Sequence, residues 1–169
     1  IKALDANGKG DVSSIAAALK IAIESNVRII NLSISAIKSS STSIIEDLIN
    51  EAIDKDILVV GAAGNNNIDA KYTIPGSIEN AIIIGACDIN GNKTASSNYG
   101  NSVDFYVAAS STSQATAIYT GYYSKYEDSG IITAINTIES TWEPIIDKIN
   151  NSSIFIIAGG GSNSGGTPG

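Results

Sequence analysis

The stretch I-L-V-V-G-A-A-G-N, residues Ile57–Asn65, decides the fold of this chain. Its first four residues are apolar and three of them are β-branched, with no alternation of polar side chains. A strand covered by helices on both faces has this pattern, so the stretch predicts a central strand of a parallel sheet. The small residues that follow allow another backbone or a ligand to come close. Asn65 then places an amide at the carboxyl end of the strand, where open α/β sheets form their sites. The alternative is a core strand that ends in an Asn-rich turn.

The rest of the chain repeats an alternation of apolar strands and amphipathic helices. Further strands are expected at five places: Ile1–Leu4, Val27–Leu32, Ala81–Ala86, Val103–Ala108 and Ile154–Ala158. Helices are expected between them, in segments that start at Ser13 or Ser14, at Ser43, at Thr112 and at Ser129. Continuous apolar strands that alternate with helices predict an α/β protein with a mainly parallel sheet.

The first two helices carry start signals and apolar stripes. Ser13 or Ser14 is expected to cap the first helix, which ends at Asn26. Ser43 and Glu46 have the spacing of a capping box for the second helix. The residues expected to face the core are Ile15, Leu19, Ala22 and Ile23 in the first helix, and Ile44 or Ile45, Leu48, Ile49, Ala52 and Ile53 in the second.

Composition excludes several classes of function. The 169 residues fit one domain, and 43% apolar with 16% charged residues is typical of a soluble globular protein. A net charge of −7 argues against binding to nucleic acid, and no apolar run reaches the roughly 20 residues of a membrane span. The single cysteine, Cys87, lies in an apolar run and is expected to be buried and inert. The chain contains no histidine, so it cannot by itself complete a mechanism that needs an imidazole base.

Two loops have some of the features of ligand sites. The turn D-A-N-G-K-G-D at Asp5–Asp11 has the alternate polar residues of a calcium loop, but Lys9 stands at a ligand position. The turn is therefore expected to be solvated, and no metal or other cofactor is predicted. The Gly/Ser-rich segment 159–169 has neither a lysine nor a following helix for a phosphate site, so it is expected to be a flexible end.

Five segments then occur in an order that resembles one family. They are V-R-I-I-N-L-S at Val27–Ser33, L-V-V-G-A-A-G-N at Leu58–Asn65, I-P-G-S-I-E-N-A-I-I-I-G-A-C-D at Ile74–Asp88, T-A-S-S-N-Y-G-N-S-V-D-F at Thr94–Phe105 and S-S-T-S-Q-A-T-A-I-Y-T-G at Ser110–Gly121. This ordered set resembles the C-terminal part of the catalytic domain of the subtilisin-like serine proteases, the subtilases. The resemblance covers residues 1–142 and implies a three-layer α/β/α fold. Residues 143–158 are then expected to form a C-terminal extension, ahead of the Gly/Ser-rich tail.

The resemblance also implies roles for individual residues. Ser113 falls on the nucleophile of the family motif and Asn65 on the donor to the oxyanion. The segments expected to line the pocket for a substrate side chain are Ser33, Ile34 and Ser35, together with Ala62, Ala63 and Gly64. For Ser113 the structural alternative is a helix N-cap. The implied activity is hydrolysis of a peptide or protein substrate, and the implied location is secreted or at the cell surface.

The chain also departs from the family pattern. Ser111 replaces a glycine of the nucleophile motif, Ala117 and Ile118 replace its Pro-His pair, and Ser35 replaces another glycine. The family's catalytic Asp and His have no counterpart here. The isolated chain is therefore expected to be inactive, with Asp and His supplied by an upstream segment or a separate chain. The alternative is a pseudoprotease scaffold that binds peptides or a partner protease.

Overall fold

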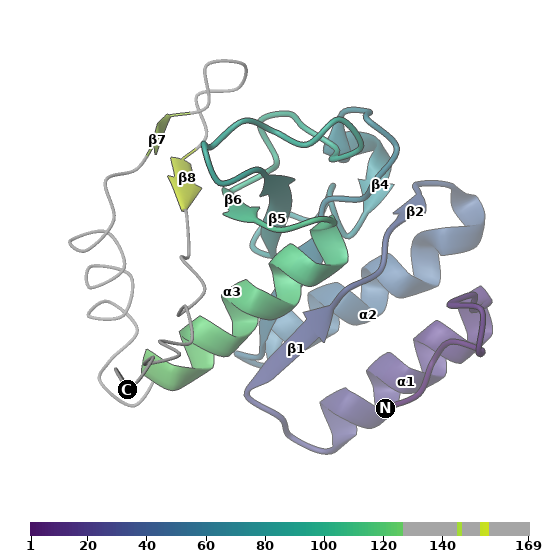
Figure 1. The fold of residues 1–169 in the computed structure, drawn as a ribbon. Helices are drawn as coiled ribbons and strands as arrows, with labels where there is room; N and C mark the ends of the chain where they lie inside the picture. Colours follow the sequence, from purple (N-terminus) through teal and green to yellow (C-terminus); the bar gives the residue numbers. More distant parts are fainter. Residues whose placement is uncertain (127–144, 147–152, 156–169) are drawn as a thin grey trace, which may run out of the picture.

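The computed structural model describes residues 1–126, 145–146 and 153–155, which form a three-layer α/β/α fold around one sheet (Figure 1). The sheet has the strand order β1-β3-β5-β6-β8-β7. Its strands are β1 (Ile29–Leu32), β3 (Leu58–Ala62), β5 (Ile82–Cys87), β6 (Phe105–Ala108), β8 (Ser153–Phe155) and β7 (Ile145–Ile146). Each neighbouring pair is parallel except β7 with β8, which is antiparallel. The prediction of a mainly parallel sheet is confirmed.

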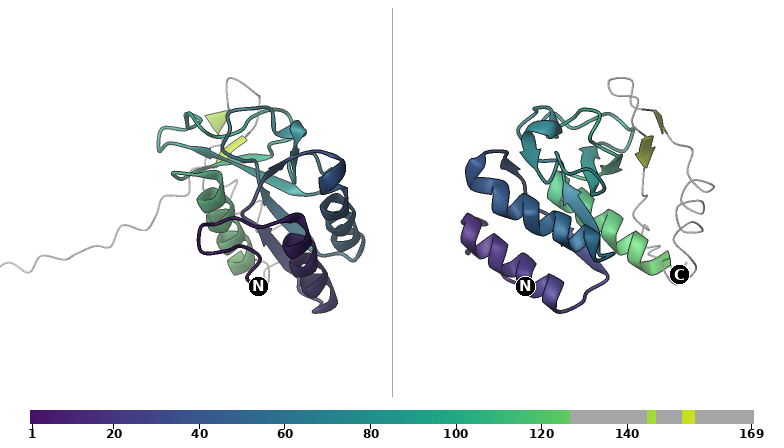
Figure 2. Two further views of the ribbon diagram at one scale, coloured as in Figure 1. Left: turned by 90° about the vertical axis from the view of Figure 1, so that its right-hand side faces the viewer. Right: turned by 180° about the vertical axis from the view of Figure 1, so that it is seen from behind.

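Helices cover both faces of this sheet. Helices α1 (Val12–Glu24) and α2 (Ser43–Asp54) lie on one side, and α3 (Thr112–Tyr126) lies on the other (Figure 2). Successive residues of β3 show the consequence. Val59 belongs to the apolar cluster that includes Ile49 of α2, whereas Val60 belongs to the cluster that includes Tyr119 of α3. Both valines are fully buried, which explains why this strand has no polar alternation.

A small second sheet and two short helices complete the described structure. Strand β2 (Ala36–Ile37) pairs in antiparallel fashion with β4 (Thr73–Ile74). The 3-10 helices are η1 (Ser40–Thr42), just before α2, and η2 (Ala70–Tyr72), just before β4. This small sheet joins the segment that leaves β1 to the segment that follows β3.

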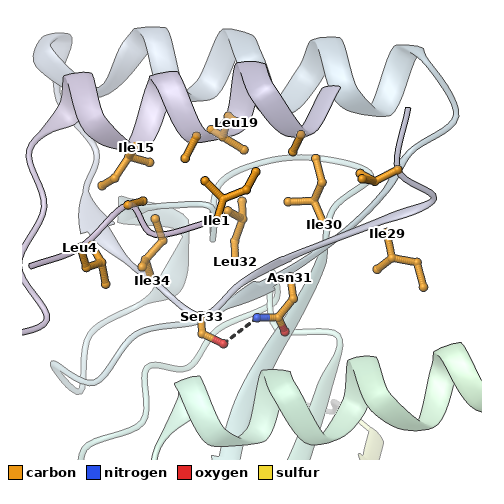
Figure 3. Close-up of a pocket in the computed structure, with 14 residues that line it drawn as sticks. Ile1, Leu4, Ile15, Leu19, Ile29, Ile30, Asn31, Leu32, Ser33 and Ile34 are labelled. Carbon is orange, nitrogen blue, oxygen red and sulfur yellow. Dashed lines mark hydrogen bonds between the residues drawn. The ribbon is translucent and has the colours of Figure 1, made fainter. Parts of the chain in front are cut away.

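The predicted strand at Ile1–Leu4 is wrong. This segment has no strand partner among the described residues, and the hydroxyl of Ser14 donates to the carbonyl of Ala3 at 3.0 Å. The side chains of Ile1 and Leu4 instead line an apolar groove of about 390 Å³ between α1 and β1 (Figure 3). Apolar residues such as Ile1, Ala3 and Leu4 indicate burial, but their segment becomes a strand only where a sheet edge is available to pair with it.

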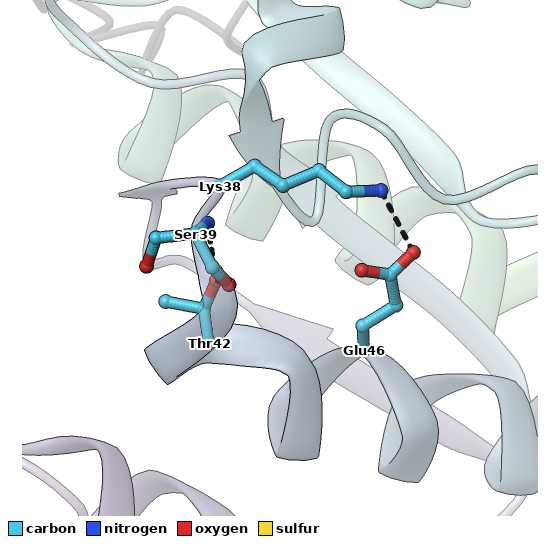
Figure 4. Close-up of polar contacts among 4 residues, drawn as sticks. All are labelled: Lys38, Ser39, Thr42 and Glu46. Atoms are coloured by element: carbon cyan, nitrogen blue, oxygen red, sulfur yellow. Dashed lines mark hydrogen bonds and ion pairs between the residues drawn. The ribbon is translucent and has the colours of Figure 1, made fainter.

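The predicted helix caps are also wrong, although the helices are where they were expected. Asp11 caps α1, because its carboxylate accepts from the N–H of Ser14 at 2.7 Å. Thr42 is the N-cap of α2, and the N–H of Ser39 donates to its hydroxyl at 2.9 Å. Glu46 therefore forms no capping box and instead accepts from the Lys38 ammonium at 2.8 Å (Figure 4).

The apolar faces follow the predicted stripes. Leu19, Ala22 and Ile23 are buried in α1, and Ile45, Ile49 and Ala52 are buried in α2. Of the two alternatives at the start of α2, Ile45 faces the core, whereas Ile44 is 46% exposed. Cys87 is fully buried at the end of β5, as predicted.

Some predictions fall on residues that are not described. The helix expected at Ser129–Trp142 and the tail at 159–169 lie outside the described residues, as do the expected domain limits. Strand β8 covers only the start of the strand expected at Ile154–Ala158. In the part of the chain that is described, no helix has the length and apolar character needed to cross a bilayer.

Candidate active site

A cavity of about 530 Å³ lies where β1 and β3 end and α3 begins. Seven of the eight residues that the sequence nominated line this cavity: Ser33, Ile34, Ser35, Ala62, Gly64, Asn65 and Ser113. They come from three segments that are far apart in the chain. The parallel sheet brings them together because the carboxyl ends of its strands meet at one edge.

Ala63 is the exception among the nominated residues. It is fully buried in the core and does not line the cavity. Its carbonyl accepts a hydrogen bond from the Asn98 side-chain amide at 2.8 Å. Ala63 therefore supports the segment that lines the cavity rather than offering surface to a ligand.

Thr112 fixes the orientation of the Asn65 amide. The Asn65 oxygen accepts from the backbone N–H of Thr112 at 3.0 Å and from the Thr112 hydroxyl at 3.1 Å. The hydroxyl of Thr112 also accepts from the N–H of Gly64 at 3.3 Å, and its side chain is fully buried. With its oxygen held by two donors, Asn65 has its N–H₂ group left to donate to water or to a ligand in the cavity that it lines.

Ser113 is the second residue of α3 and is bonded reciprocally to Ser33. The Ser113 hydroxyl donates to the Ser33 carbonyl at 2.9 Å, and the Ser33 hydroxyl donates to the Ser113 carbonyl at 3.0 Å. The alternative of Ser113 as a helix N-cap is wrong, because the Ser111 hydroxyl accepts from the N–H of Gln114 at 3.3 Å. A carbonyl oxygen orients the Ser113 hydroxyl but is too weak a base to remove its proton.

The cavity holds no general base among the described residues that line it. The one ionisable side chain there is that of Lys9, which comes from the loop before α1. A lysine ammonium is a donor and carries no lone pair for a proton. The site therefore combines a hydroxyl, an oriented amide and a helix N-terminus, and the element it lacks is an acceptor for the Ser113 proton.

Asn98 is a structural residue of the site that the sequence analysis missed. It is fully buried, and its side-chain oxygen accepts from the N–H groups of Asn66 at 2.9 Å and Ile68 at 3.1 Å. Together with its bond to Ala63, this side chain fixes the loop that carries Asn65. Asn98 lies in one of the segments that resemble the family, but nothing in that segment indicates a bond to residues about 30 positions earlier.

In the loop at Asp5–Asp11, the Asp5 carboxylate is hydrogen-bonded to the backbone of the loop itself. One oxygen of Asp5 accepts from the N–H groups of Asn7 at 2.8 Å and Lys9 at 2.9 Å. These backbone bonds, that of Lys9 most strongly, lower the pKa of the Asp5 carboxyl. Among the described residues, no group of three or more His, Cys, Asp or Glu side chains is arranged to hold a metal ion.

Comparison with known sequences and structures identifies the family. The sequence model of the Subtilase family matches residues 1–134. The thermophilic serine proteinase of Bacillus sp. (strain AK1) is 40% identical over 104 residues, which are 62% of this chain and 25% of that protein. The thermostable alkaline protease of Halalkalibacterium halodurans is 32% identical over 158 residues, 80% of this chain and 43% of that protein.

A solved structure supports the fold independently. The structure of a cold adapted subtilisin-like serine proteinase has a TM-score of 0.79, with 18% sequence identity, over 92% of this chain and 64% of that chain. The match with this chain thus covers a quarter of the first of these proteases and less than half of the second. The fold, the order of its segments and the family match agree, and the chain belongs to the subtilase family.

Proposed function

We propose that this chain provides the nucleophile and oxyanion half of a subtilase site for peptide hydrolysis. Ser113 is the nucleophile and Asn65 is the oxyanion donor. The Asp and His of the site come from an upstream segment or a separate chain. The relatives are named as proteases, and they are longer than this chain, which is consistent with a site that is shared with further sequence.

The observation that carries this proposal is the orientation of Asn65 beside Ser113. Thr112 holds the Asn65 oxygen from two directions, so the N–H₂ group is free to donate, and both residues line one cavity. An oriented amide donor stabilises the oxyanion of the transition state by about 2.7–4 kcal/mol, a figure that itself comes from a subtilisin.

The chemistry of the completed site follows from these positions. The imidazole takes the Ser113 proton as the hydroxyl oxygen attacks the carbonyl carbon of a peptide, and the bond from Ser113 to the Ser33 carbonyl breaks. The negative oxygen that forms is stabilised by Asn65 and by N–H groups at the start of α3. The imidazole then gives its proton to the leaving amine. Ser33, Ile34 and Ser35 line the cavity together with Ala62 and Gly64, and they contact the substrate.

The isolated chain is inactive in this proposal because it contains no histidine. Loss of the base costs about six orders of magnitude in kcat, again a figure from subtilisin. Incubation with a fluorophosphonate probe, followed by intact-mass analysis, is expected to leave Ser113 unlabelled. An active subtilisin under the same conditions is the positive control.

The result that contradicts this proposal is stoichiometric labelling of the isolated chain that the Ser113→Ala variant abolishes. A second arm tests the shared site directly. An upstream segment that carries the Asp and His, co-expressed with this chain, is expected to restore labelling at Ser113. If that complex forms and Ser113 is still unlabelled, the catalytic assignment is wrong.

The second candidate function is a pseudoprotease scaffold that binds peptides or a partner protease. The observation that favours it is the engagement of the Ser113 hydroxyl with the Ser33 carbonyl, together with the replacement of the motif's Pro-His by Ala117 and Ile118. Calorimetric peptide binding that survives Ser113→Ala, without cleavage in the complex, would support this candidate. A secreted or cell-surface location belongs to both candidates and is tested by fractionation of producing cells.

A further inference from the structure

A row of polar side chains runs from the middle of α3 to Ser113. The Thr120 hydroxyl donates to the Asn31 side-chain oxygen at 2.9 Å, and the Asn31 amide donates to the Ser33 hydroxyl at 2.8 Å. The Ser33 hydroxyl donates in turn to the Ser113 carbonyl at 3.0 Å. We call these four residues the polar ladder.

The geometry of the two elements explains why the ladder is continuous. Thr120 follows Ser113 by seven residues, or two turns, so both lie on one face of α3. Asn31 and Ser33 are two residues apart and lie on one side of the β1 segment. Figure 3 shows both side chains pointing away from α1, whereas Ile30 and Leu32 point toward it. The ladder thus joins a polar strip of β1 to a polar strip of α3.

We propose that Thr120 and Asn31 are positioning residues for Ser113, and that they act through Ser33. Ser33 makes two bonds to Ser113, one through its hydroxyl and one through its carbonyl. The amide of Asn31 fixes the Ser33 hydroxyl, and Thr120 fixes the amide. This inference rests on the proposed role of Ser113 as the nucleophile.

The contribution of Thr120 is shared between two acceptors. Its hydroxyl also donates to the Thr116 carbonyl at 2.8 Å, the bond that a helical threonine commonly makes to the preceding turn. A hydroxyl has one proton, so Asn31 and Thr116 compete for it. Asn31 is exposed and Thr120 is half-buried, so water also competes for these bonds. The effect of removing one of them is therefore modest and measurable.

The test uses a thiol in place of the Ser113 hydroxyl, because the buffer rather than a histidine of the protein can take its proton and no peptide bond has to be hydrolysed. In the Ser113→Cys variant, the rate of alkylation by iodoacetamide is followed by intact mass. Adding Asn31→Ala or Thr120→Val is expected to raise this rate about two- to tenfold, the range expected for one net hydrogen bond. The reason is that the Ser33 hydroxyl then no longer holds the backbone carbonyl of residue 113, so this residue shifts and its thiol leaves the Ser33 carbonyl.

Two control variants separate positioning from general loosening of the fold. Thr120→Ser keeps the hydroxyl and is expected to keep the rate of Ser113→Cys. Ser124→Ala removes an exposed hydroxyl elsewhere on α3 and is expected to do the same. The native chain gives the background rate of Cys87, which is fully buried.

Each outcome decides the proposal. The proposal is overturned if Asn31→Ala and Thr120→Val leave the alkylation rate unchanged or lower it. It is also overturned if Thr120→Ser raises the rate as much as Thr120→Val does. A second adduct, on Cys87, reveals unfolding. If Asn31→Ala unfolds the chain, the comparison of Thr120→Val with Thr120→Ser decides. Fluorophosphonate labelling tests the nucleophile itself, so failure of that role and failure of the ladder are distinguishable.

Discussion

Gly64 lies between Asn98 and Ser35 at the candidate site, and these neighbours leave no room for a side chain. Its φ is +104°, and a Cβ built there would lie 2.5 Å from the Asn98 side-chain nitrogen and 2.7 Å from the Ser35 hydroxyl. The neighbouring residues cannot move freely, because Asn98 is fully buried and holds the Ala63 carbonyl. The small residues after β3 are therefore needed for close packing as well as for access to a ligand.

Gly64→Ala is expected to lower the free energy of unfolding by about 2–5 kcal/mol, from backbone strain together with overpacking. Gly8→Ala is the matched control, because Gly8 also has a positive φ, +72°, but a Cβ there meets nothing within 4 Å. Its expected loss is the strain alone, about 1–2 kcal/mol. Urea unfolding measures both. Equal losses at the two positions would show that crowding at Gly64 has no effect.

Single residues of the site could be predicted where a short sequence motif contains them. They were missed where their role depends on a partner that is far away in the sequence. Asn65 stands out because it follows an apolar strand, and Ser113 because its segment resembles the nucleophile motif of the family. The bond from Thr112 to Asn65 spans 47 positions, and that from Asn98 to Ala63 spans 35. No local pattern encodes such a pair, because each partner alone is an ordinary polar residue.

At the scale of elements, the start of α1 depends on an acidic cap. The Asp11 carboxylate accepts from the N–H of Ser14 and from the Ser13 hydroxyl, each at 2.7 Å. These bonds, chiefly the one from the Ser14 backbone, lower the pKa of Asp11. A carboxyl whose pKa is lower in the folded chain stabilises the fold above its unfolded pKa, and that contribution is lost as the pH falls through the folded pKa.

Asp11→Asn keeps the hydrogen-bond acceptor and removes the titration, so it isolates this effect. The stability of the native chain relative to Asp11→Asn is expected to be constant near neutral pH and to decline below about pH 4. Asp5 and Asp88 also have lowered pKa values, but they are present in both proteins and cancel. Thermal unfolding across a pH series measures the difference. Parallel pH profiles would show that the cap does not couple to protonation.

Element types were predictable from pattern, whereas element ends were not. The apolar run at Leu58–Ala62 is explained by burial on both faces of the sheet, and the stripe of α2 by burial of one face of the helix. A cap has several candidates within a few residues, since Asp11, Ser13 and Ser14 can all accept a backbone N–H. Which one does so depends on the path of the preceding loop, and that path is set by contacts outside the helix.

At the scale of the whole molecule, strand β3 separates two apolar cores. The cluster on one face includes Ile49 of α2, and the cluster on the other includes Tyr119 of α3, which stacks on Phe105 with ring centroids 5.4 Å apart. Alternation of strands and helices predicted these layers. It could not predict that Ile1–Leu4 lacks a sheet partner within the described part of the chain, because pairing depends on which other strands are present at the sheet edge.

Val59 and Val60 test whether the three layers unfold as one cooperative unit. Both are fully buried neighbours in β3, and each Val→Ala change is expected to cost about 2 kcal/mol, from lost burial plus a small cavity. If the layers are cooperative, each variant lowers amide-exchange protection equally in α2 and α3. Ile44→Ala, at a 46% exposed position on α2, is the control for truncation without loss of the core. Protection lost only in α2 for Val59→Ala, and only in α3 for Val60→Ala, would show that the two faces of the sheet unfold separately.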